Sequence, residues 1–302
     1  MMRTIAALLI GASLLASCNQ YDKTPTGMAY KITHGGGKAL LKNGEFVKFN
    51  ILYKIASRDT TLIDSYKHIP AYIMVDTARP TKHSFLEVIT KCAVGDKIDF
   101  MMSVDSLKNL GLLQFNETFH PRDMITGKVE FLKSFPNQQE ATLDYQKEME
   151  NEKDREVKEL KDFVKNKGIK TVATPSGALV EVTNPGDSYK ADTGTQARVL
   201  YRGTFLNGKE FETNMKGPNQ QPLHVIIGQN TVIPGMDEGL RLFGKGGKGK
   251  IYVPAMLAYG QGGNPPVIPA FANLVFEVEL VDVSKADPTP AQGLMVPHPA
   301  GK

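Results

Sequence analysis

The sequence has few cysteines, little net charge and no grouped histidines, and each shortage excludes a class of protein. Its 36 basic and 32 acidic side chains are mixed along the 302 residues, so the net charge of +4 argues against a nucleic-acid partner. The six histidines lie without metal-ligand spacing, and we expect neither a metal nor a cofactor. What the sequence does have is 41% hydrophobic residues, enough for the cores of two globular domains.

The N-terminal apolar run is shorter than the roughly 20 residues that a helix needs to cross a bilayer. It extends from Ile5 to Ala16, after the basic Arg3 and before small residues, which is typical of a targeting segment over residues 1–17. The letters "LASC" resemble a bacterial lipobox. This resemblance implies cleavage before Cys18, a lipid on its sulfur, and a chain anchored to a membrane of the bacterial cell envelope, facing the periplasm or the exterior. The alternative is an ordinary secretion signal with an incidental cysteine.

Only two cysteines occur in the sequence, Cys18 and Cys92. If Cys18 carries a lipid, Cys92 has no cysteine left to pair with, and the exported chain folds without an internal disulfide. We therefore predict that Cys92 is a small buried apolar side chain rather than a reactive thiol. Packing must then supply the stability of the fold.

The sequence contains a weak internal repeat. It reads "TPTGMAYKI" near Pro25 and "TPSGALVEV" near Pro175, and a tyrosine follows each proline, Tyr53 after 28 residues and Tyr201 after 26. Both copies continue with an apolar residue beside an acid, a helical segment and a final strand. The apolar and acidic pairs are Ile63 and Asp64 in the first copy and Phe211 and Glu212 in the second. We predict two related domains, with limits at 24–135 and 168–284.

A charged segment without proline or glycine separates the two copies, from Gln138 to Lys167. Its apolar residues include Leu160 and Val164 at helical spacing, and Gly168 follows in the position of a helix stop. We predict one long helix of about 28 residues within a linker over 136–167. A coiled-coil homodimer through this helix is an alternative, although the apolar positions do not keep a heptad.

The second copy alternates apolar and polar residues in the manner of strands, as in "ARVLYRGTF" and "LVFEVELVDV". Asn207 and Gly208 form a strong hairpin signal between two such runs. One short helix is predicted from about Met236 to Leu242. The expected fold class is α+β, an antiparallel sheet packed on one short helix. After it, residues 285–302 form a proline-rich tail for which we predict disorder.

Four segments of the second copy resemble the FKBP-type peptidyl-prolyl cis-trans isomerases in their order and separation: "VLYRGTFLNGKEFETN", "VIPGMDEGL", "AYGQGG" and "VIPAFANLVFEVEL". The resemblance covers Gly168 to Val283 and is much weaker over Thr24 to Phe135. It implies two FKBP-like domains joined by the long charged helix. It also implies isomerase activity, without a cofactor, that assists the folding of exported proline-containing polypeptides.

The resemblance further implies how such a site works. An apolar, aromatic pocket stabilises the twisted X-Pro amide more than the planar one, and the proline-rich loop after "AYG" is a rigid wall because each proline fixes its φ angle. Neither a nucleophile nor a proton shuttle is needed. The alternative is a non-catalytic peptide-binding module or holdase chaperone that uses the same pocket.

The family's site residues are carried over by matched position. Those with a direct part in catalysis are Tyr201, Phe211, Glu212, Ile233, Tyr259 and Phe276. Those that would line the substrate pocket are Leu223, Val232, Met236, Asn264, Val267 and Ile268. The Tyr259 hydroxyl and the Ile233 backbone N–H would each donate a hydrogen bond to a substrate carbonyl. The family often has aspartate, phenylalanine, tryptophan and histidine where this chain has Glu212, Leu223, Met236 and Asn264, and the flexible Met236 thioether argues against tight binding of macrolide inhibitors.

Taken one at a time, these residues have plainer interpretations. Phe211, Ile233 and Phe276 are each more often ordinary core residues, and only their joint spacing favours a site. The letters "GKGGKG" from Gly244 match the G-x-G-x-x-G pattern of dinucleotide sites. They follow a helix and precede a strand, however, whereas a phosphate-binding loop follows a strand and begins a helix.

The first copy departs from the site pattern. It lacks "AYG" and "VIPG", and Gly127 falls at the position of the phenylalanine that forms the floor of the pocket. Tyr53 and Asp64 are retained, but two residues do not make a cavity. We predict a fold kept without isomerase activity, used for holding unfolded substrate or for pairing subunits.

Overall fold

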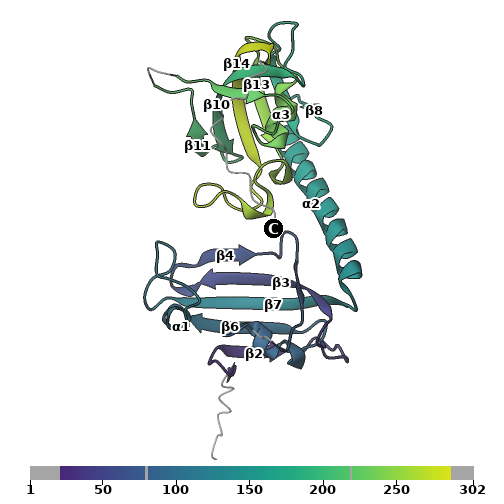
Figure 1. Cartoon of the computed structure of the whole chain (residues 1–302), viewed down its shortest axis with the longest axis vertical. Coiled ribbons are helices and arrows are strands. Elements are labelled where there is room, and N and C mark those ends of the chain that lie inside the picture. The colour runs from purple at the N-terminus through teal and green to yellow at the C-terminus, as the bar shows by residue number, and fades with distance from the viewer. Residues whose placement is uncertain (1–20, 79–80, 218–219, 287–302) are drawn as a thin grey trace, which may run out of the picture. The chain divides into compact units, whose positions relative to one another are not determined.

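The computed structural model describes residues 21–78, 81–217 and 220–286 of the chain. The chain divides into two compact units, 1–145 and 146–302, and each contains one seven-stranded antiparallel sheet (Figure 1). The targeting segment, Cys18 and most of the proline-rich tail lie outside the described residues. In the part of the chain that the structure describes, no helix has the length and apolar character needed to cross a membrane.

The sheet of the first unit runs in the order β1-β2-β6-β7-β3-β4, with β5 also paired to β3. Its strands are β1 (Asp22–Lys23), β2 (Ala29–Thr33), β3 (Phe46–Ile55), β4 (Thr60–Asp64), β5 (Ala71–Met74), β6 (Lys97–Ser103) and β7 (Met124–Phe135). Three short helical segments are η1 (Ala56–Arg58), η2 (Phe85–Lys91) and α1 (Val104–Asn109). Alternate residues of β7 face the core, where Cys92 is buried among phenylalanines, as the sequence predicts.

The sheet of the second unit runs in the order β11-β10-β14-β13-β9-β8, with β12 paired to β10. Its strands are β8 (Val172–Ala173), β9 (Leu179–Asn184), β10 (Thr195–Phe205), β11 (Glu210–Thr213), β12 (Leu223–Ile226), β13 (Lys248–Val253) and β14 (Leu274–Lys285). Its short helices are α3 (Pro234–Leu240), η3 (Ala255–Leu257) and η4 (Gly260–Gly262). Helix α3 begins two residues before the predicted Met236, because Pro234 occupies its first turn, where a missing N–H costs nothing.

The two sheets have the same topology. Each strand of the first unit has its counterpart seven strands later, and both sheets carry a register shift at equivalent places, after Lys48 in β3 and after Arg198 in β10. The repeat seen in the sequence is therefore a repeat of structure. Two antiparallel sheets with few helices agree with the expected α+β class.

The hairpin predicted at Asn207 and Gly208 joins β10 to β11. The N–H of Gly208 donates to the carbonyl of Phe205 at 2.9 Å, and the N–H of Phe205 donates to the carbonyl of Lys209 at 3.0 Å. Gly208 has φ +85°, a conformation that glycine adopts without a steric penalty. The hairpin thus has the three-residue form with glycine in the left-handed position, rather than the two-residue form.

Helix α2 (Gln138–Asn166) begins in the first unit. There its Asp144 accepts hydrogen bonds from the ammonium of Lys48 at 2.8 Å and the hydroxyl of Tyr72 at 2.6 Å. Lys133 donates a further bond to the same carboxylate at 3.1 Å. Burial opposes the charge of Asp144, but these three donors outweigh it and lower the pKa of the carboxyl to about 2.

The rest of α2 belongs to the second unit. Leu160 and Val164 are buried there against Tyr252 and Val275 of the sheet. Because the chain's own strands cover these two side chains, they cannot also form the core of the coiled coil considered above. Gly168, with φ +67°, follows the end of the helix in the conformation of a C-terminal stop.

Candidate functional site

Three aromatic side chains gather on the core face of the second sheet. The ring of Phe276, on β14, lies 6.2 Å from that of Tyr201 on β10 and 5.9 Å from that of Phe211 on β11. The Phe211 and Phe276 rings meet edge to face, the arrangement that aromatic quadrupoles favour. Phe205 adds a fourth ring, 5.2 Å from Phe211.

Gly203 makes this arrangement possible. It pairs with Phe276 in the ladder between β10 and β14, and the Phe211 ring lies over it. A Cβ atom added to Gly203 would lie 2.5 Å from Cζ of Phe211, well inside contact distance. A glycine at this point of the strand therefore leaves room for the Phe211 ring.

Nine of the twelve residues predicted for the site belong to one apolar cluster of the second unit. Of these nine, Val232, Met236, Ile268 and Phe276 are buried, and Tyr201, Phe211, Leu223, Ile233 and Tyr259 are half-buried. The other three predicted residues are Glu212, Asn264 and Val267, whose side chains are exposed. The structure thus brings the apolar set together and leaves two loop residues, Asn264 and Val267, facing solvent.

Of the three exposed residues, Glu212 lies close enough to the cluster to affect its tyrosines. Glu212 acts electrostatically on both tyrosines of the cluster. Burial raises the pKa of Tyr201, and a hydrogen bond to the Glu212 carboxylate raises it further. Burial also raises the pKa of Tyr259, with a smaller contribution from the charge of Glu212. Both phenols, like ordinary tyrosines, are protonated at neutral pH and can donate hydrogen bonds.

Backbone hydrogen bonds close the proline-rich loop on itself. The N–H of Asn264 donates to the carbonyl of Ile268 at 2.7 Å, and the N–H of Ile268 donates to the carbonyl of Asn264 at 2.9 Å. The N–H of Phe271 donates to the carbonyl of Gly260 at 2.9 Å. This closure directs Ile268, which is 3% exposed, into the core and turns Val267, which is 51% exposed, away from it.

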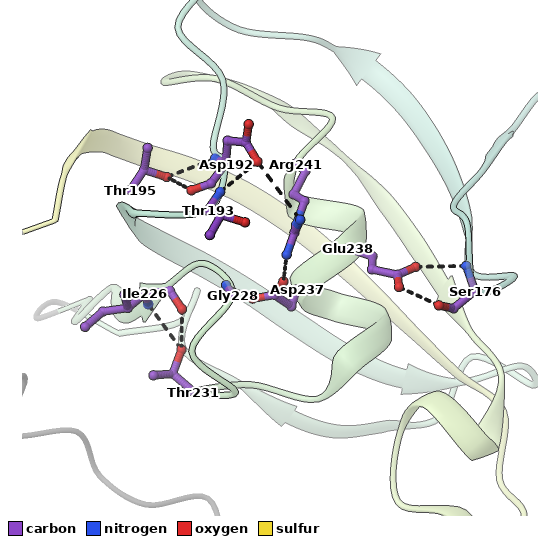
Figure 2. Close-up of polar contacts among 10 residues, drawn as sticks. All are labelled: Ser176, Asp192, Thr193, Thr195, Ile226, Gly228, Thr231, Asp237, Glu238 and Arg241. Atoms are coloured by element: carbon purple, nitrogen blue, oxygen red, sulfur yellow. Dashed lines mark hydrogen bonds and ion pairs between the residues drawn. The ribbon is translucent and has the colours of Figure 1, made fainter.

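A polar frame holds the segment before α3 (Figure 2). The Thr231 hydroxyl accepts a hydrogen bond from the N–H of Ile226 at 3.1 Å and donates one to the carbonyl of the same residue at 3.2 Å. The carboxylate of Asp237, which is buried, accepts from the N–H of Gly228 at 2.8 Å and from Arg241 at 2.7 Å. These bonds fix both sides of the segment that carries Val232 and Ile233.

Helix α3 is also held from its opposite side. Figure 2 shows Glu238 directed toward Ser176, whose hydroxyl donates to the carboxylate at 2.6 Å and whose N–H donates at 3.2 Å. The residue before the helix, Ile233, makes bonds through its carbonyl to Met236 and Asp237. Among the described residues, no acceptor takes the N–H of Ile233, so this donor is available where the sequence predicts one.

The first unit has a different arrangement at the equivalent place. Gly127 of β7 pairs with Tyr53 and Phe100, as Phe276 of β14 pairs with Gly203 and Ile251. The Phe100 ring occupies the space beside Gly127, and its Cζ lies 1.9 Å from where a Cβ would be. An aromatic ring from the neighbouring strand thus fills the space that Phe276 fills in the second unit.

The strand register also corrects two equivalences drawn from the sequence. Tyr201 pairs with Val278, two residues after Phe276. In the first unit, the residue that pairs with Val129, two residues after Gly127, is Ile51 and not Tyr53. In β4, Ile63 rather than Asp64 occupies the register of Glu212. The apparent retention of a tyrosine and an acid in the first unit is therefore wrong, and its departure from the site is greater than the sequence indicated.

Sequence reasoning missed two residues of the second unit, Gly203 and Phe205. Both lie on β10 at two-residue steps from Tyr201, so the alternation of a strand places all three on one face. That periodicity was the available signal. Among the described residues, no three side chains of histidine, cysteine, aspartate or glutamate lie together so as to hold a metal ion.

Comparison with known proteins identifies relatives of the second unit. Residues 187–281 match the family profile described as "FKBP-type peptidyl-prolyl cis-trans isomerase". The chain is 37% identical over 107 residues to the FK506-binding protein of Neisseria meningitidis, a match that covers 35% of this chain and 96% of that protein.

Two longer relatives match as well. The FKBP-type peptidyl-prolyl cis-trans isomerase FkpA of Escherichia coli K12 is 40% identical over 131 residues, which is 42% of this chain and 46% of that protein. The FkpA protein of Buchnera aphidicola from Baizongia pistaciae is 28% identical over 223 residues, covering 73% of this chain and 83% of that protein. The chain thus spans less than half the length of the Escherichia coli relative.

Proposed function

Because this chain belongs to the FKBP-type peptidyl-prolyl cis-trans isomerase family, we propose that its second unit catalyses cis–trans isomerisation of X-Pro peptide bonds. The observation that carries this proposal is the single aromatic cluster of Tyr201, Phe211 and Phe276. Two hydrogen-bond donors accompany the cluster, the hydroxyl of Tyr259 and the N–H of Ile233. The proposed catalytic domain extends over 168–284.

The reaction breaks no covalent bond. Rotation about the X-Pro amide must pass a barrier of about 18–20 kcal/mol, because the planar amide loses its resonance on the way. The twisted amide has a less polar carbonyl than the planar one, so apolar surroundings cost it less. Side chains such as Phe211 and Phe276, which exclude water, therefore favour the twisted form, and this differential binding is the source of the rate enhancement.

The two donors orient the substrate. The phenol of Tyr259, which is protonated at neutral pH, would donate to one substrate carbonyl. The N–H of Ile233 would donate to another, and the polar frame around Asp237 keeps that N–H in place. A chain held at two carbonyls can turn about the bond between them, which lowers the entropy that the transition state must lose.

A protease-coupled assay of the full chain on a short proline peptide tests this proposal. The wild type is expected to accelerate isomerisation, and Tyr259→Phe to lower kcat/KM by roughly two- to tenfold, because one neutral hydrogen bond contributes about 0.5–1.5 kcal/mol. Tyr189→Phe is the matched control, since that tyrosine is 53% exposed and outside the cluster. A wild type that binds the peptide without accelerating its isomerisation supports the holdase alternative and contradicts catalysis.

The first unit, over 24–135, is proposed to be an FKBP-like domain that has lost catalysis, joined to the second by a linker helix over 136–167. Its topology, equal to that of the second unit, supports the common origin. The Phe100 ring beside Gly127 supports the loss of a substrate space. A role in holding unfolded chains or in pairing subunits is compatible with a fold kept for purposes other than isomerisation.

The substrates are proposed to be exported polypeptides. The chain is proposed to bind them at a membrane surface, to which a lipid on Cys18 anchors it. The apolar run from Ile5 to Ala16 and the letters "LASC" support this proposal. The wild type, expressed in bacteria with a labelled fatty acid, is expected to carry the label and to sediment with membranes. Cys18→Ser should lose both properties. An unlabelled wild type in the soluble fraction would instead indicate an ordinary secretion signal.

A further inference from the structure

Helix α2 contacts the loop of the second unit that carries the proposed donor Tyr259. The carboxylate of Glu156, through Oε2, accepts a hydrogen bond from the backbone N–H of Met256 at 2.8 Å. Glu156 is 2% exposed and lies on the same face of the helix as the buried Leu160 and Val164. A buried carboxylate of this kind is costly unless it has a specific partner, which here is the first turn of η3.

A second contact joins α2 to the other end of the same loop. Oε2 of Glu159 accepts a hydrogen bond from Nδ2 of Asn273 at 3.0 Å. Oδ1 of Asn273 accepts one from the N–H of Ala255 at 2.9 Å, and Asn273 is 7% exposed. The chain from 255 to 273 is thus held to the helix where it begins and where it returns to β14.

These contacts satisfy groups that η3 cannot satisfy itself. The first N–H groups of any helix have no partner within the helix, and those of Ala255 and Met256 are the first two of η3. Asn273 takes the former and Glu156 takes the latter. Because η3 ends at Leu257, two residues before Tyr259, its position sets the starting point of the Tyr259 segment.

We propose that Glu156, assisted by Glu159 through Asn273, is a positioning residue for the isomerase reaction. It acts through η3 on Tyr259 and does not touch the substrate. Helix α2 is then a part of the catalytic unit as well as a connection between the two units. This inference rests on the proposed function, since the effect of loop position is measured as isomerase activity.

The surroundings of Glu156 also predict a dependence on pH. Burial raises the pKa of Glu156 to about 7, the hydrogen bond from Met256 opposes this rise, and the like charge of Glu152 adds to it. Arg155, which is paired with Glu152, favours the charged form weakly. The charged groups with the largest effects on this carboxyl are Glu152, which raises its pKa, and Arg155, which lowers it.

The sign of the pH effect follows from the pKa values in the two states. The docked helix holds the Glu156 proton up to a pH of about 7, whereas a free glutamate releases it near 4.5. The docked state therefore binds more protons between these values, and docking weakens as the pH rises from about 4.5 to about 7 and is constant above that. The loop around Tyr259 should be held best on the acidic side of neutrality.

Three variants of the full chain test the inference, with kcat/KM measured between pH 5 and 8 by a protease-free assay on a short proline peptide. Glu156→Ala leaves the N–H of Met256 without its acceptor and should lower kcat/KM by roughly three- to tenfold. Glu156→Gln keeps an oxygen acceptor without a charge, so it should retain activity and lose the wild-type change between pH 5 and 7. Glu150→Gln removes one exposed charge from the same helix and should behave as the wild type.

The outcomes separate this inference from the proposed function. A wild type without activity would refute the proposed function itself. With an active wild type, unchanged activity and an unchanged pH profile in both Glu156 variants would overturn the positioning role. Equal losses in both variants with the wild-type pH profile would also overturn it, because that result indicates a purely structural defect. If Glu156→Ala does not fold, the pH profile of Glu156→Gln decides.

Discussion

Replacing Phe276 with leucine is expected to lower kcat/KM for a short proline peptide by at least about fivefold, because it removes the central ring of the aromatic cluster and each aromatic contact is worth about 0.5–1.5 kcal/mol. The Phe276 ring lies 6.2 Å from that of Tyr201 and 5.9 Å from that of Phe211, and the side chain is 4% exposed. Leucine fills much of the same space, so the sheet should persist. The loss then concerns the aromatic surface offered to the twisted amide. The measurement is the proline-peptide assay on the full chain.

Phe243→Leu is the matched control for this prediction. Phe243 is a fully buried phenylalanine of the same unit, and its ring packs over Gly249, whereas the Phe211 ring of the aromatic cluster packs over Gly203. Both substitutions remove a buried ring and should lower the free energy of unfolding by similar amounts, whereas only Phe276→Leu should lower activity. Equal activity losses in the two variants would mean that stability, not the aromatic cluster, governs the result.

The same experiment examines the first unit. If that unit had isomerase activity of its own, the Phe276 variant would keep a large residual rate that is insensitive to the second unit. The register of Gly127 and the place of Phe100 predict that no such residual rate exists. A residual rate close to that of the wild type would contradict either the role of the aromatic cluster or the proposed loss of catalysis in the first unit.

The apolar part of the site could be predicted from the sequence because it depends on local patterns. Tyr201, Phe211 and Phe276 lie on strands whose alternation is visible in the letters, and the hairpin at Asn207 and Gly208 sets two of these strands side by side. The second unit also follows a family pattern with four ordered segments. Strand alternation and the family pattern can both be recognised in the sequence, since neither depends on how distant segments pack.

The sequence comparison of the two copies matched Tyr53 to Tyr201 although their distances from the preceding proline differ by two residues. Tyr201 stands 26 residues after Pro175, and the residue 26 after Pro25 is Ile51, not Tyr53. The displacement of two residues equals the period of a strand, so Tyr53 still faces the core and mimics a retained site residue. Only the ladder of paired residues distinguishes a true equivalent from a neighbour on the same face.

The contacts of α2 could not be predicted at all. Glu156 and Met256 are 100 residues apart, and on sequence alone a glutamate in a charged helix indicates a solvated face. Glu156 lies four residues before Leu160, on the face of the helix that packs, but the sequence does not show which segment meets that face. The same holds for Val267, whose exposure follows from the closure of the loop between Asn264 and Ile268.

Replacing Gly127 with alanine is expected to lower the free energy of unfolding of the first unit by about 3 kcal/mol, through overpacking of its core. The new Cβ would lie 1.9 Å from Cζ of Phe100 and 2.2 Å from its Cε2, so the ring must move. Phe100 is 1% exposed and packs against Tyr53 at 5.3 Å and Phe85 at 6.2 Å. Its neighbours leave it no free direction. Hydrogen exchange of the β7 amides measures the loss within this unit.

A second substitution identifies the cause of that loss. Ile251 stands in the second unit at the register of Phe100, so Phe100→Ile should make room for alanine at position 127. The loss of unfolding free energy in the double variant is expected to be smaller than the sum of the two single losses by at least about 1 kcal/mol. Such non-additivity indicates a direct steric conflict between the two positions. Strictly additive losses would show that Phe100 does not fill this space, and the first unit would then retain room for a substrate.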